Sequence, residues 1–421
     1  MPNNKYLAVI GMGYVGLPLA VEFGKKRKTI GYDLNQTRIN ELLQHIDKTE
    51  EVDSLNLKKA EHLIFTDNIN DLKDADNFIL TVPTPVDINN QPDMSYVISA
   101  TEQVSKFIKK GSYIIYESTV YPGATEEVCV PILSNISGLE FNKDFFVGYS
   151  PERINPGDKS KRITDIVKVT SGSNEKAAVF IDNLYKEIIS AGTYRAPSIK
   201  VAEAAKVIEN TQRDLNIALV NELSIIFDRL NIDTNEVLDA ASTKWNFVKY
   251  KPGLVGGHCI GVDPYYLTYK ALDLGYEPKI ILSGRKLNNS MSQYVSNKLI
   301  DLMTAKNIDV ASSSILVLGI TFKENCPDIR NSKVLDLIEH LKCVAKNVDV
   351  YDPWVKKNQI SNTSIIDKLE QKKKYDAILL AVPHDIFLSS GLSSIKESLK
   401  PNSVFFDLKG VFPKELSDAR L

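Results

Sequence analysis

The sequence has few cysteines and no long apolar run, and each absence excludes a class of protein. The four cysteines, Cys129, Cys259, Cys326 and Cys343, show no close paired spacing, so we expect free thiols rather than a zinc site or a disulfide framework. The longest uncharged stretch, residues 6–21, contains three glycines and a proline and is too short for a membrane helix. It also lacks the basic flank and small-residue cleavage site of a secretory signal. We therefore expect a cytoplasmic protein.

The sequence also has no large excess of positive or negative charge. Lys and Arg number 51 against 53 Asp and Glu, which gives a formal net charge of −2 and no electrostatic footprint for a nucleic acid partner. A chain of 421 residues with 43% hydrophobic and 25% charged side chains has the composition of a globular protein. At about 150 residues per domain, this length predicts two or three domains.

Short apolar runs alternate with helical patterns along the first third of the chain. We expect strands at residues 6–10, 29–33, 77–83, 113–118 and 145–149, with a helix over 15–26 between the first two. Strand, helix, strand in this rhythm implies right-handed crossovers and a parallel sheet. The sequence therefore predicts a doubly wound α/β domain.

A helical pattern follows at residues 198–232, where apolar residues recur at helical spacing. One long helix there would connect two domains and could pack against a second subunit; two shorter helices with a kink near Arg213 are the alternative. From about residue 309 the first pattern returns, with expected strands at 314–319, 348–352 and 376–383 and a helix over 332–341. Two lobes of similar topology are expected on either side of the helical segment.

Three glycines, Gly11, Gly13 and Gly16, follow the first expected strand as GMGYVG and open a helix, and Asp33 ends the next strand. In a dinucleotide turn the first glycine permits the tight turn, the second lets the backbone approach the pyrophosphate and the third allows the helix to pack closely on the strand. The phosphates then lie at a helix N-terminus. Because a carboxylate at position 33 accepts hydrogen bonds from a ribose and repels a 2′-phosphate, we expect NAD rather than NADP. A tight turn without a ligand is the alternative.

A second group of candidates surrounds Cys259. Four glycines lie between Lys251 and Pro264, so the thiol can approach another molecule and attack a carbonyl as a thiolate. The alternatives are a small core thiol for Cys259, and a structural rather than a general-base role for His258. On the long helix, Lys206, Asn210 and Arg213 project along one face, either as donors to a developing oxyanion or as a solvated stripe.

Six ordered motifs resemble the UDP-glucose/GDP-mannose dehydrogenase family over nearly the whole chain. They are GMGYVGLPLA at 11–20, ESTVYPG at 117–123, SPERI at 150–154, AKVIEN at 205–210, GGHCIGVDP at 256–264 and GITFKENCPDIRNS at 319–332. The resemblance implies two Rossmann-like domains with doubly wound parallel sheets, joined by a long central helix and a helical dimerisation domain. It divides the chain into an NAD-binding domain at 1–197, a central helical domain with the cysteine loop at 198–308 and a UDP-sugar-binding domain at 309–421.

The resemblance also implies a four-electron oxidation of the sugar's primary alcohol to a carboxylate with two NAD. Cys259 would form a thiohemiacetal and then a thioester, and Lys206 and Asn210 would hold the oxyanion and the substrate. Asp263 would assist proton transfer or orient the water, and Glu152 would be the second acid/base. No metal is implied. The implied catalytic residues are Cys259, Lys206, Asn210, Asp263, Glu152 and Thr119. The implied NAD contacts are Gly11, Gly13, Tyr14, Val15, Gly16, Asp33, Arg38, Thr84, Thr119 and Arg330. The implied substrate contacts are Glu152, Arg153, Lys206, Asn210, Arg213, Lys249, Tyr250, Gly256, His258 and Lys323.

One departure bears on the substrate. The UDP-glucose branch of the family usually has Lys immediately before the aspartate of the cysteine loop, whereas this chain has Val262. The loop is similar to the branch that oxidises UDP-N-acetylhexosamines, which favours UDP-N-acetylglucosamine or its galacto epimer and a product for polysaccharide or O-antigen synthesis. UDP-N-acetylmannosamine and UDP-glucose are alternatives. A two-electron 3-hydroxyacid-type dehydrogenase and a non-catalytic NAD-binding protein are more distant ones.

Overall fold

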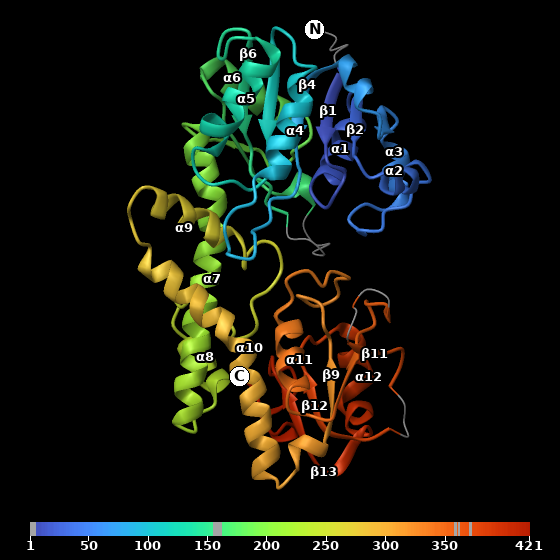
Figure 1. Ribbon diagram of the computed structural model, residues 1–421, viewed down its shortest axis with the longest axis vertical. Coiled ribbons are helices and arrows are strands. Elements are labelled where there is room, and N and C mark those ends of the chain that lie inside the picture. The colour runs from blue at the N-terminus through green and yellow to red at the C-terminus, as the bar shows by residue number, and fades with distance from the viewer. Residues whose placement is uncertain (1–5, 155–161, 358–359, 361–362, 370–372) are drawn as a thin grey trace. The chain divides into compact units, whose positions relative to one another are not determined.

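The computed structural model describes residues 6–154, 162–357, 360, 363–369 and 373–421 (Figure 1). The chain divides into two compact units. Unit 1 comprises residues 1–209 and 265–277, and unit 2 comprises residues 210–264 and 278–421. Within the described ranges, no helix is both long and apolar enough to cross a membrane.

Unit 1 is built on a six-stranded parallel sheet with the strand order β3-β2-β1-β4-β5-β6. The strands are β1 (Tyr6–Ile10), β2 (Thr29–Tyr32), β3 (Leu63–Thr66), β4 (Ala75–Leu80), β5 (Ser112–Tyr116) and β6 (Phe145–Tyr149). All residues of β2, β5 and β6 are buried, as is typical of a parallel sheet that is covered on both faces. β7 (Lys168–Thr170) and β8 (Thr193–Arg195) form a separate two-stranded parallel sheet.

Helices connect these strands and bury apolar side chains within unit 1. They are α1 (Gly16–Gly24), α2 (Gln36–Leu43), α3 (Ser54–Lys59), α4 (Ser95–Ser105), α5 (Val130–Ser137) and α6 (Glu175–Lys186), with the short helices η1 (Ile69–Asp74), η2 (Thr125–Cys129) and η3 (Ile163–Asp165). Side chains cap several of them; Asn35, for example, accepts the N–H of Arg38 at the start of α2.

Unit 2 repeats the topology in a five-stranded parallel sheet with the order β11-β10-β9-β12-β13. Its strands are β9 (Ser314–Leu318), β10 (Asn347–Tyr351), β11 (Ser364–Ile366), β12 (Tyr375–Leu380) and β13 (Leu399–Asp407). Its helices include α8 (Thr234–Ala241), α10 (Lys279–Ala305), α11 (Lys333–Lys342) and α12 (Asp385–Lys396), with η4 (Val310–Ser312) and η6 (Lys414–Leu416). α10 and α11 contribute Met291, Val295 and Leu337 to one core of this unit.

Two helices contain residues of both units. α7 (Ile199–Arg229) is one continuous helix of 31 residues, so the alternative of two helices that meet near Arg213 is wrong. α9 (Asp263–Asp273) begins in the cysteine loop.

The predicted fold class is confirmed, and the differences from the sequence prediction concern element ends. The strands expected at 77–83 and 113–118 end earlier, at Leu80 and Tyr116, because the chain turns away at the sheet's carboxyl edge. The helix expected over 15–26 is Gly16–Gly24. The 27-residue α10 was not anticipated from the sequence.

Candidate functional site

The glycine turn after β1 has the geometry of a dinucleotide site. Gly11 has φ 97°, a value that favours glycine, and its N–H donates to Tyr32 O at 2.8 Å. A Cβ on Gly16 would lie 1.8 Å from Gly11 O and 2.3 Å from Thr81 Oγ1, so a side chain has no room there. A Cβ on Gly13 would meet nothing within 4 Å, which leaves open space beside the backbone at the start of α1.

Asp33 is bound to this turn. Its Oδ2 accepts the N–H of Met12 at 2.7 Å, and its Oδ1 accepts the N–H of Asn35 at 2.9 Å. The carboxylate is half-buried at the end of β2, where a ribose can reach it. Open space at the second glycine together with this carboxylate fits NAD.

The Arg38 side chain is bonded to the backbone of the glycine turn. Its Nε donates to Met12 O at 2.8 Å, and its Nη2 lies 2.8 Å from Asp47 Oδ1, whose side chain is fully buried. Burial raises the pKa of Asp47, but hydrogen bonds from Thr49 and the Val52 N–H and the charge of Arg38 bring the pKa below its usual value. Arg38 therefore fixes the backbone of the glycine turn.

Thr84 and Thr119 follow β4 and β5, and both are half-buried. The order of the sheet reverses between β1 and β4, so the glycine turn and Thr84 flank the switch point at which ligands bind to such sheets. Tyr14 and Val15 lie within the turn, between Gly13 and the start of α1.

A buried cluster of charges lies at the carboxyl end of β5 and β6. Lys168 Nζ is 2.7 Å from Glu117 Oε2 and 3.3 Å from Glu152 Oε2, and the Tyr185 hydroxyl donates to Glu117 Oε1. Burial, countered by Lys168 and reinforced by Glu152, raises the pKa of Glu117 to about 7. Glu152 Oε1 also accepts the backbone N–H of Arg153 and of Ile154, at 2.6 and 2.5 Å.

The cysteine loop, residues 251–264, lies in unit 2 together with Asn210 of α7. The carbonyl of Cys259 accepts the N–H of Val262 at 3.2 Å and that of Asp263 at 2.9 Å, which closes the loop onto the start of α9. Asn210 Nδ2 donates to Asp263 Oδ2 at 2.5 Å, and both side chains are buried. The structure thus brings together two predicted catalytic residues that lie 53 positions apart in the sequence.

The other candidates on α7 and in the cysteine loop differ in exposure. Lys206 lies one helical turn before Asn210 and is buried, whereas Arg213 is exposed. Lys249 is exposed and Tyr250 is half-buried. Cys259 is half-buried.

The other three cysteines do not share this setting. All four are free, as predicted; Cys129 and Cys326 are buried and Cys343 is exposed. Burial raises the pKa of the Cys129 thiol to about 12, which keeps it protonated. Among the residues that the structure describes, no group of His, Cys, Asp and Glu is arranged to hold a metal ion.

The segment after β9 contacts the cysteine loop. The N–H of Gly257 donates to Asn331 O at 3.3 Å, and a Cβ on Gly256 would lie 2.6 Å from the same oxygen. Arg330 forms a bidentate pair with Asp328, whose Oδ2 lies 4.0 Å from His258 Nδ1. Burial and the charge of Arg330 lower the pKa of His258 against the opposing effect of Asp328, which favours the neutral imidazole.

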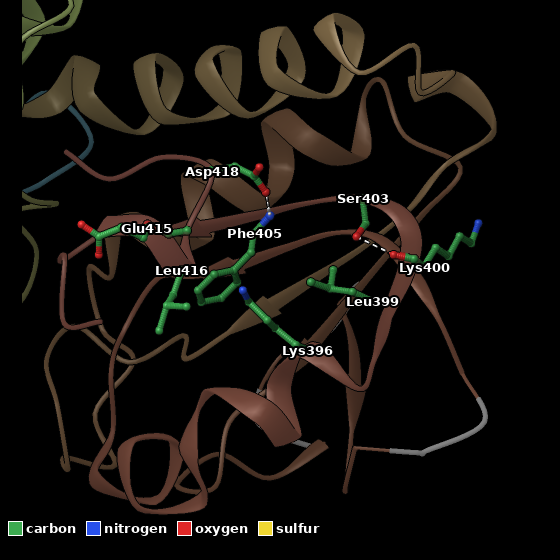
Figure 2. Close-up of a pocket in the computed structure, with 9 residues that line it drawn as sticks. Lys396, Leu399, Lys400, Ser403, Phe405, Glu415, Leu416 and Asp418 are labelled. Atoms are coloured by element: carbon green, nitrogen blue, oxygen red, sulfur yellow. Dashed lines mark hydrogen bonds between the residues drawn. The ribbon is translucent and has the colours of Figure 1, made fainter. Parts of the chain in front are cut away.

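The described part of unit 2 contains cavities at the switch point of its sheet and along its edge strand. A cavity of about 50 Å³ lies between the segments that follow β9 and β12, the switch point of the second sheet, and Lys323 and Gly256 line it. A larger one of about 320 Å³ lies along β13 (Figure 2), where the C-terminal segment covers this edge strand through the bond from Phe405 N–H to Asp418 Oδ2. None of the predicted site residues lines the larger cavity.

Sequence reasoning missed several buried polar residues around these sites. Lys168 and Tyr185 belong to the charged cluster, and a lysine inside the apolar run of residues 166–170 was the available signal. Glu203 on α7 accepts the N–H of Gly123 and of Thr125 at 2.5 and 3.0 Å. Asn221 exchanges two hydrogen bonds with Gly253, at 2.8 and 3.0 Å, and so ties the cysteine loop to α7.

Comparison with known proteins finds three domains of one family along the chain. The NAD binding domain of the UDP-glucose/GDP-mannose dehydrogenase family matches residues 5–189, its central domain matches 200–290, and its UDP binding domain matches 316–414. The chain belongs to the UDP-glucose/GDP-mannose dehydrogenase family. As a member it is an NAD-dependent oxidoreductase that acts on a UDP-sugar.

Individual members of the UDP-glucose/GDP-mannose dehydrogenase family align over nearly the full chain. UDP-N-acetyl-D-glucosamine 6-dehydrogenase from Pseudomonas aeruginosa is 56% identical over 99% of both chains. Protein CapL from Staphylococcus aureus is 51% identical over 97% of this chain and 96% of its own. The solved UDP-D-ManNAc dehydrogenase from Pyrococcus horikoshii superposes with a TM-score of 0.88 at 31% identity, over 97% of this chain and 96% of its own.

Proposed function

We propose that this protein oxidises the 6-hydroxymethyl group of UDP-N-acetylglucosamine to the carboxylate in two steps, with UDP-N-acetylgalactosamine as the closest competing substrate. The balanced reaction converts RCH2OH, water and two NAD+ into RCOO−, two NADH and three H+. When bound at the glycine turn, NAD+ would supply the hydride acceptor for each oxidation. The residues of the chain bind the sugar, hold the oxyanion and provide the thiol.

The observation that carries the proposal is the arrangement around Cys259. Cys259 is half-buried in a glycine-rich loop, and its backbone carbonyl accepts the N–H of Asp263. The Asp263 carboxylate in turn accepts a hydrogen bond from the Asn210 amide. A thiolate there would attack the sugar aldehyde to form a thiohemiacetal, and loss of hydride would leave a thioester. Lys206 and Asn210 would stabilise the oxyanion, since preorganised donors contribute most where charge develops.

Water must then release the acid from the thioester. Asp263 would assist proton transfer or orient this water, Glu152 would act as the second acid/base, and Thr119 is the remaining catalytic residue that we propose. The buried cluster of Lys168 and Glu117 around Glu152 supports a role in proton transfer, because burial brings the pKa of Glu117 to about 7, near the working pH.

We assign the NAD site to the glycine turn, with the ribose on Asp33 and the pyrophosphate at the start of α1. Its contacts would be Gly11, Gly13, Tyr14, Val15, Gly16, Asp33, Arg38, Thr84, Thr119 and Arg330. The UDP-sugar would contact Glu152, Arg153, Lys206, Asn210, Arg213, Lys249, Tyr250, Gly256, His258 and Lys323. The domain limits that we propose are 1–197, 198–308 and 309–421.

The choice of sugar rests on two observations. The Pseudomonas aeruginosa UDP-N-acetyl-D-glucosamine 6-dehydrogenase is 56% identical to this chain. Val262 precedes Asp263 in the position where a lysine marks the UDP-glucose branch. An apolar side chain there offers no ammonium group to the substrate.

We also propose a homodimer formed through α7, in the cytoplasm. Val201, Ile208, Leu219 and Ile226 on this helix are 45 to 55% exposed, and each of the pairs 201/208 and 219/226 is seven positions apart. Large apolar side chains at this spacing share one face of a helix and favour a partner helix. Four free thiols fit a reducing compartment.

The test is a comparison of UDP-N-acetylglucosamine, UDP-N-acetylgalactosamine, UDP-N-acetylmannosamine and UDP-glucose, with NAD, followed by absorbance of NADH and mass spectrometry of the sugar. We expect the highest kcat/KM with UDP-N-acetylglucosamine and two NADH per uronic acid. One NADH per sugar would contradict the four-electron reaction. Equal kcat/KM with UDP-glucose would contradict the interpretation of Val262.

A further inference from the structure

The two sheets can be compared strand by strand, because β1, β2 and β4 correspond to β9, β10 and β12. Gly11 and Gly319 follow the first strand of each set, with φ 97° and 83°, and their N–H groups donate to Tyr32 O and Tyr351 O at 2.8 and 2.9 Å. An aspartate, Asp33 or Asp352, directly follows the second strand of each set. Unit 2 therefore retains the turn and the carboxylate of a dinucleotide site.

The carboxylates keep the same backbone bonds in both units. Asp33 Oδ2 accepts the N–H of Met12 at 2.7 Å, and Asp352 Oδ2 accepts the N–H of Ile320 at 2.7 Å. The bonds of the other oxygen also correspond, since Asp33 Oδ1 accepts the N–H of Asn35 and Asp352 Oδ1 accepts that of Trp354.

The surroundings of the two carboxylates differ. Asp33 is half-buried, whereas Asp352 is 3% exposed and His384 covers it with no exposed surface of its own. His384 Nε2 lies 3.0 Å from Asp352 Oδ2 and 3.3 Å from Thr321 Oγ1. His384 thus makes at Asp352 the hydrogen bond that a ribose hydroxyl would make at an open carboxylate.

The glycine turn itself is altered in unit 2. Thr321 and Glu324 stand where Gly13 and Gly16 stand in unit 1. α11 begins at Lys333, fourteen positions after Gly319, whereas α1 begins five positions after Gly11. In unit 2, residues 320–332 therefore separate the turn from the helix. The backbone that a pyrophosphate would approach carries side chains there, and no helix N-terminus lies directly after the turn to bind its phosphates.

His384 also binds this segment. Its Nδ1 accepts the N–H of Asn325 at 2.9 Å, and Asn325 Oδ1 in turn accepts the N–H of Asp385 at 3.0 Å. Since Nδ1 is an acceptor, the ring proton is on Nε2 and is donated to Asp352. Thr321 Oγ1 donates to Lys323 O at 2.8 Å, next to the side chain that lines the small cavity at the switch point.

We propose that His384 is a positioning residue for the UDP moiety. It occupies the ribose position of a former dinucleotide turn, and through Asp352 and Asn325 it fixes the 320–332 segment that presents Lys323. This inference rests on the proposed function, because it takes the small cavity between the segments after β9 and β12 as part of the UDP site.

The experiment measures binding of UDP and of NAD to the full-length protein by calorimetry. We expect His384→Ala to raise the Kd for UDP about tenfold, since binding must then order the segment, and to leave the Kd for NAD within about twofold. His384→Asn keeps an acceptor for the N–H of Asn325 and should recover most of the UDP affinity. His384→Gln keeps a donor toward Asp352 but not that acceptor, and should recover less. His340→Ala, which removes an imidazole from the last turn of α11, is the matched control and should bind UDP as the wild type does.

Several outcomes would overturn the proposal. They are unchanged UDP binding in His384→Ala, equal losses of UDP and NAD affinity, or recovery by glutamine rather than by asparagine. If His384→Ala does not fold, the comparison of the asparagine and glutamine variants decides. A wild-type protein that binds no UDP would contradict the proposed function itself, whereas tight UDP binding that is indifferent to position 384 would contradict only this inference.

Discussion

Removal of the buried ammonium group of Lys168 should destabilise unit 1 in a pH-dependent way. Lys168 is 3% exposed and pairs with Glu117 and Glu152, which are 1% and 6% exposed. Lys168→Met would leave two buried carboxylates without a cation, and breaking a buried ion pair in this way costs about 3 to 5 kcal/mol. The loss is large compared with a total stability of about 5 to 15 kcal/mol.

The sign of the pH dependence follows from Glu117. Its folded-state pKa of about 7 lies above the ordinary value of 4.5, so the folded protein holds a proton that the unfolded chain has released. Stability from this group is therefore present at acidic pH and falls as the pH rises between these two values, by about 3 kcal/mol at about 1.36 kcal/mol per pKa unit. Without Lys168 the pKa of Glu117 rises further, and the loss of folding stability extends to higher pH.

The assay is urea unfolding, followed by circular dichroism at about pH 6 and about pH 8. We expect Lys168→Met to lose more stability at the higher pH, where both carboxylates must ionise. The double variant Lys168→Met/Glu117→Gln removes one of the two charges and should recover a large part of the loss. Lys143→Met, which breaks an exposed ion pair with Glu140, is the control and should leave the unfolding midpoint unchanged. Equal losses at both pH values, or a Lys168→Met protein as stable as the wild type, would refute the reasoning.

Other predictions concern the remaining sites. Cys259→Ser should abolish uronic acid formation while NAD binding measured by calorimetry is retained; full turnover would exclude the thiol as nucleophile. Gly16→Ala should weaken NAD binding by at least tenfold, about 1.4 kcal/mol, because the new Cβ would overlap Gly11 O; an unchanged Kd would contradict this. Burial raises the pKa of Glu203 to about 7, so its contribution to stability falls between about pH 4.5 and about pH 7, and Glu203→Gln should flatten that part of the urea stability profile. Leu219→Lys should shift the sedimentation coefficient to that of a monomer, whereas a persisting dimer would exclude this face of α7.

The order of elements was predictable because it rests on local patterns. Apolar runs of five to seven residues predicted β1, β2, β4, β5 and β6, and each was found within a few residues of its expected ends. The ends were less accurate, because they depend on where the chain leaves the sheet edge. The glycine turn was recognisable because the constraint at Gly16 acts over five residues and leaves a fixed spacing in the sequence.

The buried polar contacts could not be predicted in the same way. Lys168 meets Glu117 across 51 positions, and His384 meets Asp352 across 32, so no local pattern records either pair. The sequence predicted two lobes of similar topology, but it did not show that His384 of unit 2 bonds to the aspartate of its own turn.

The sequence by itself determined the class of fold, the dinucleotide turn and the set of candidate residues, because strand runs, glycine spacing and motif order are properties of neighbouring positions. Only the tertiary structure decided which side chains meet. Asn210 bonds to Asp263, Arg38 bonds to Met12 O of the glycine turn and pairs with Asp47, and His384 bonds to Asp352. These contacts depend on distances between segments far apart in the chain. Burial and hydrogen bonding shift the pKa of Asp47 only in the folded chain, because a carboxylate loses its hydration only when the surrounding elements have packed around it.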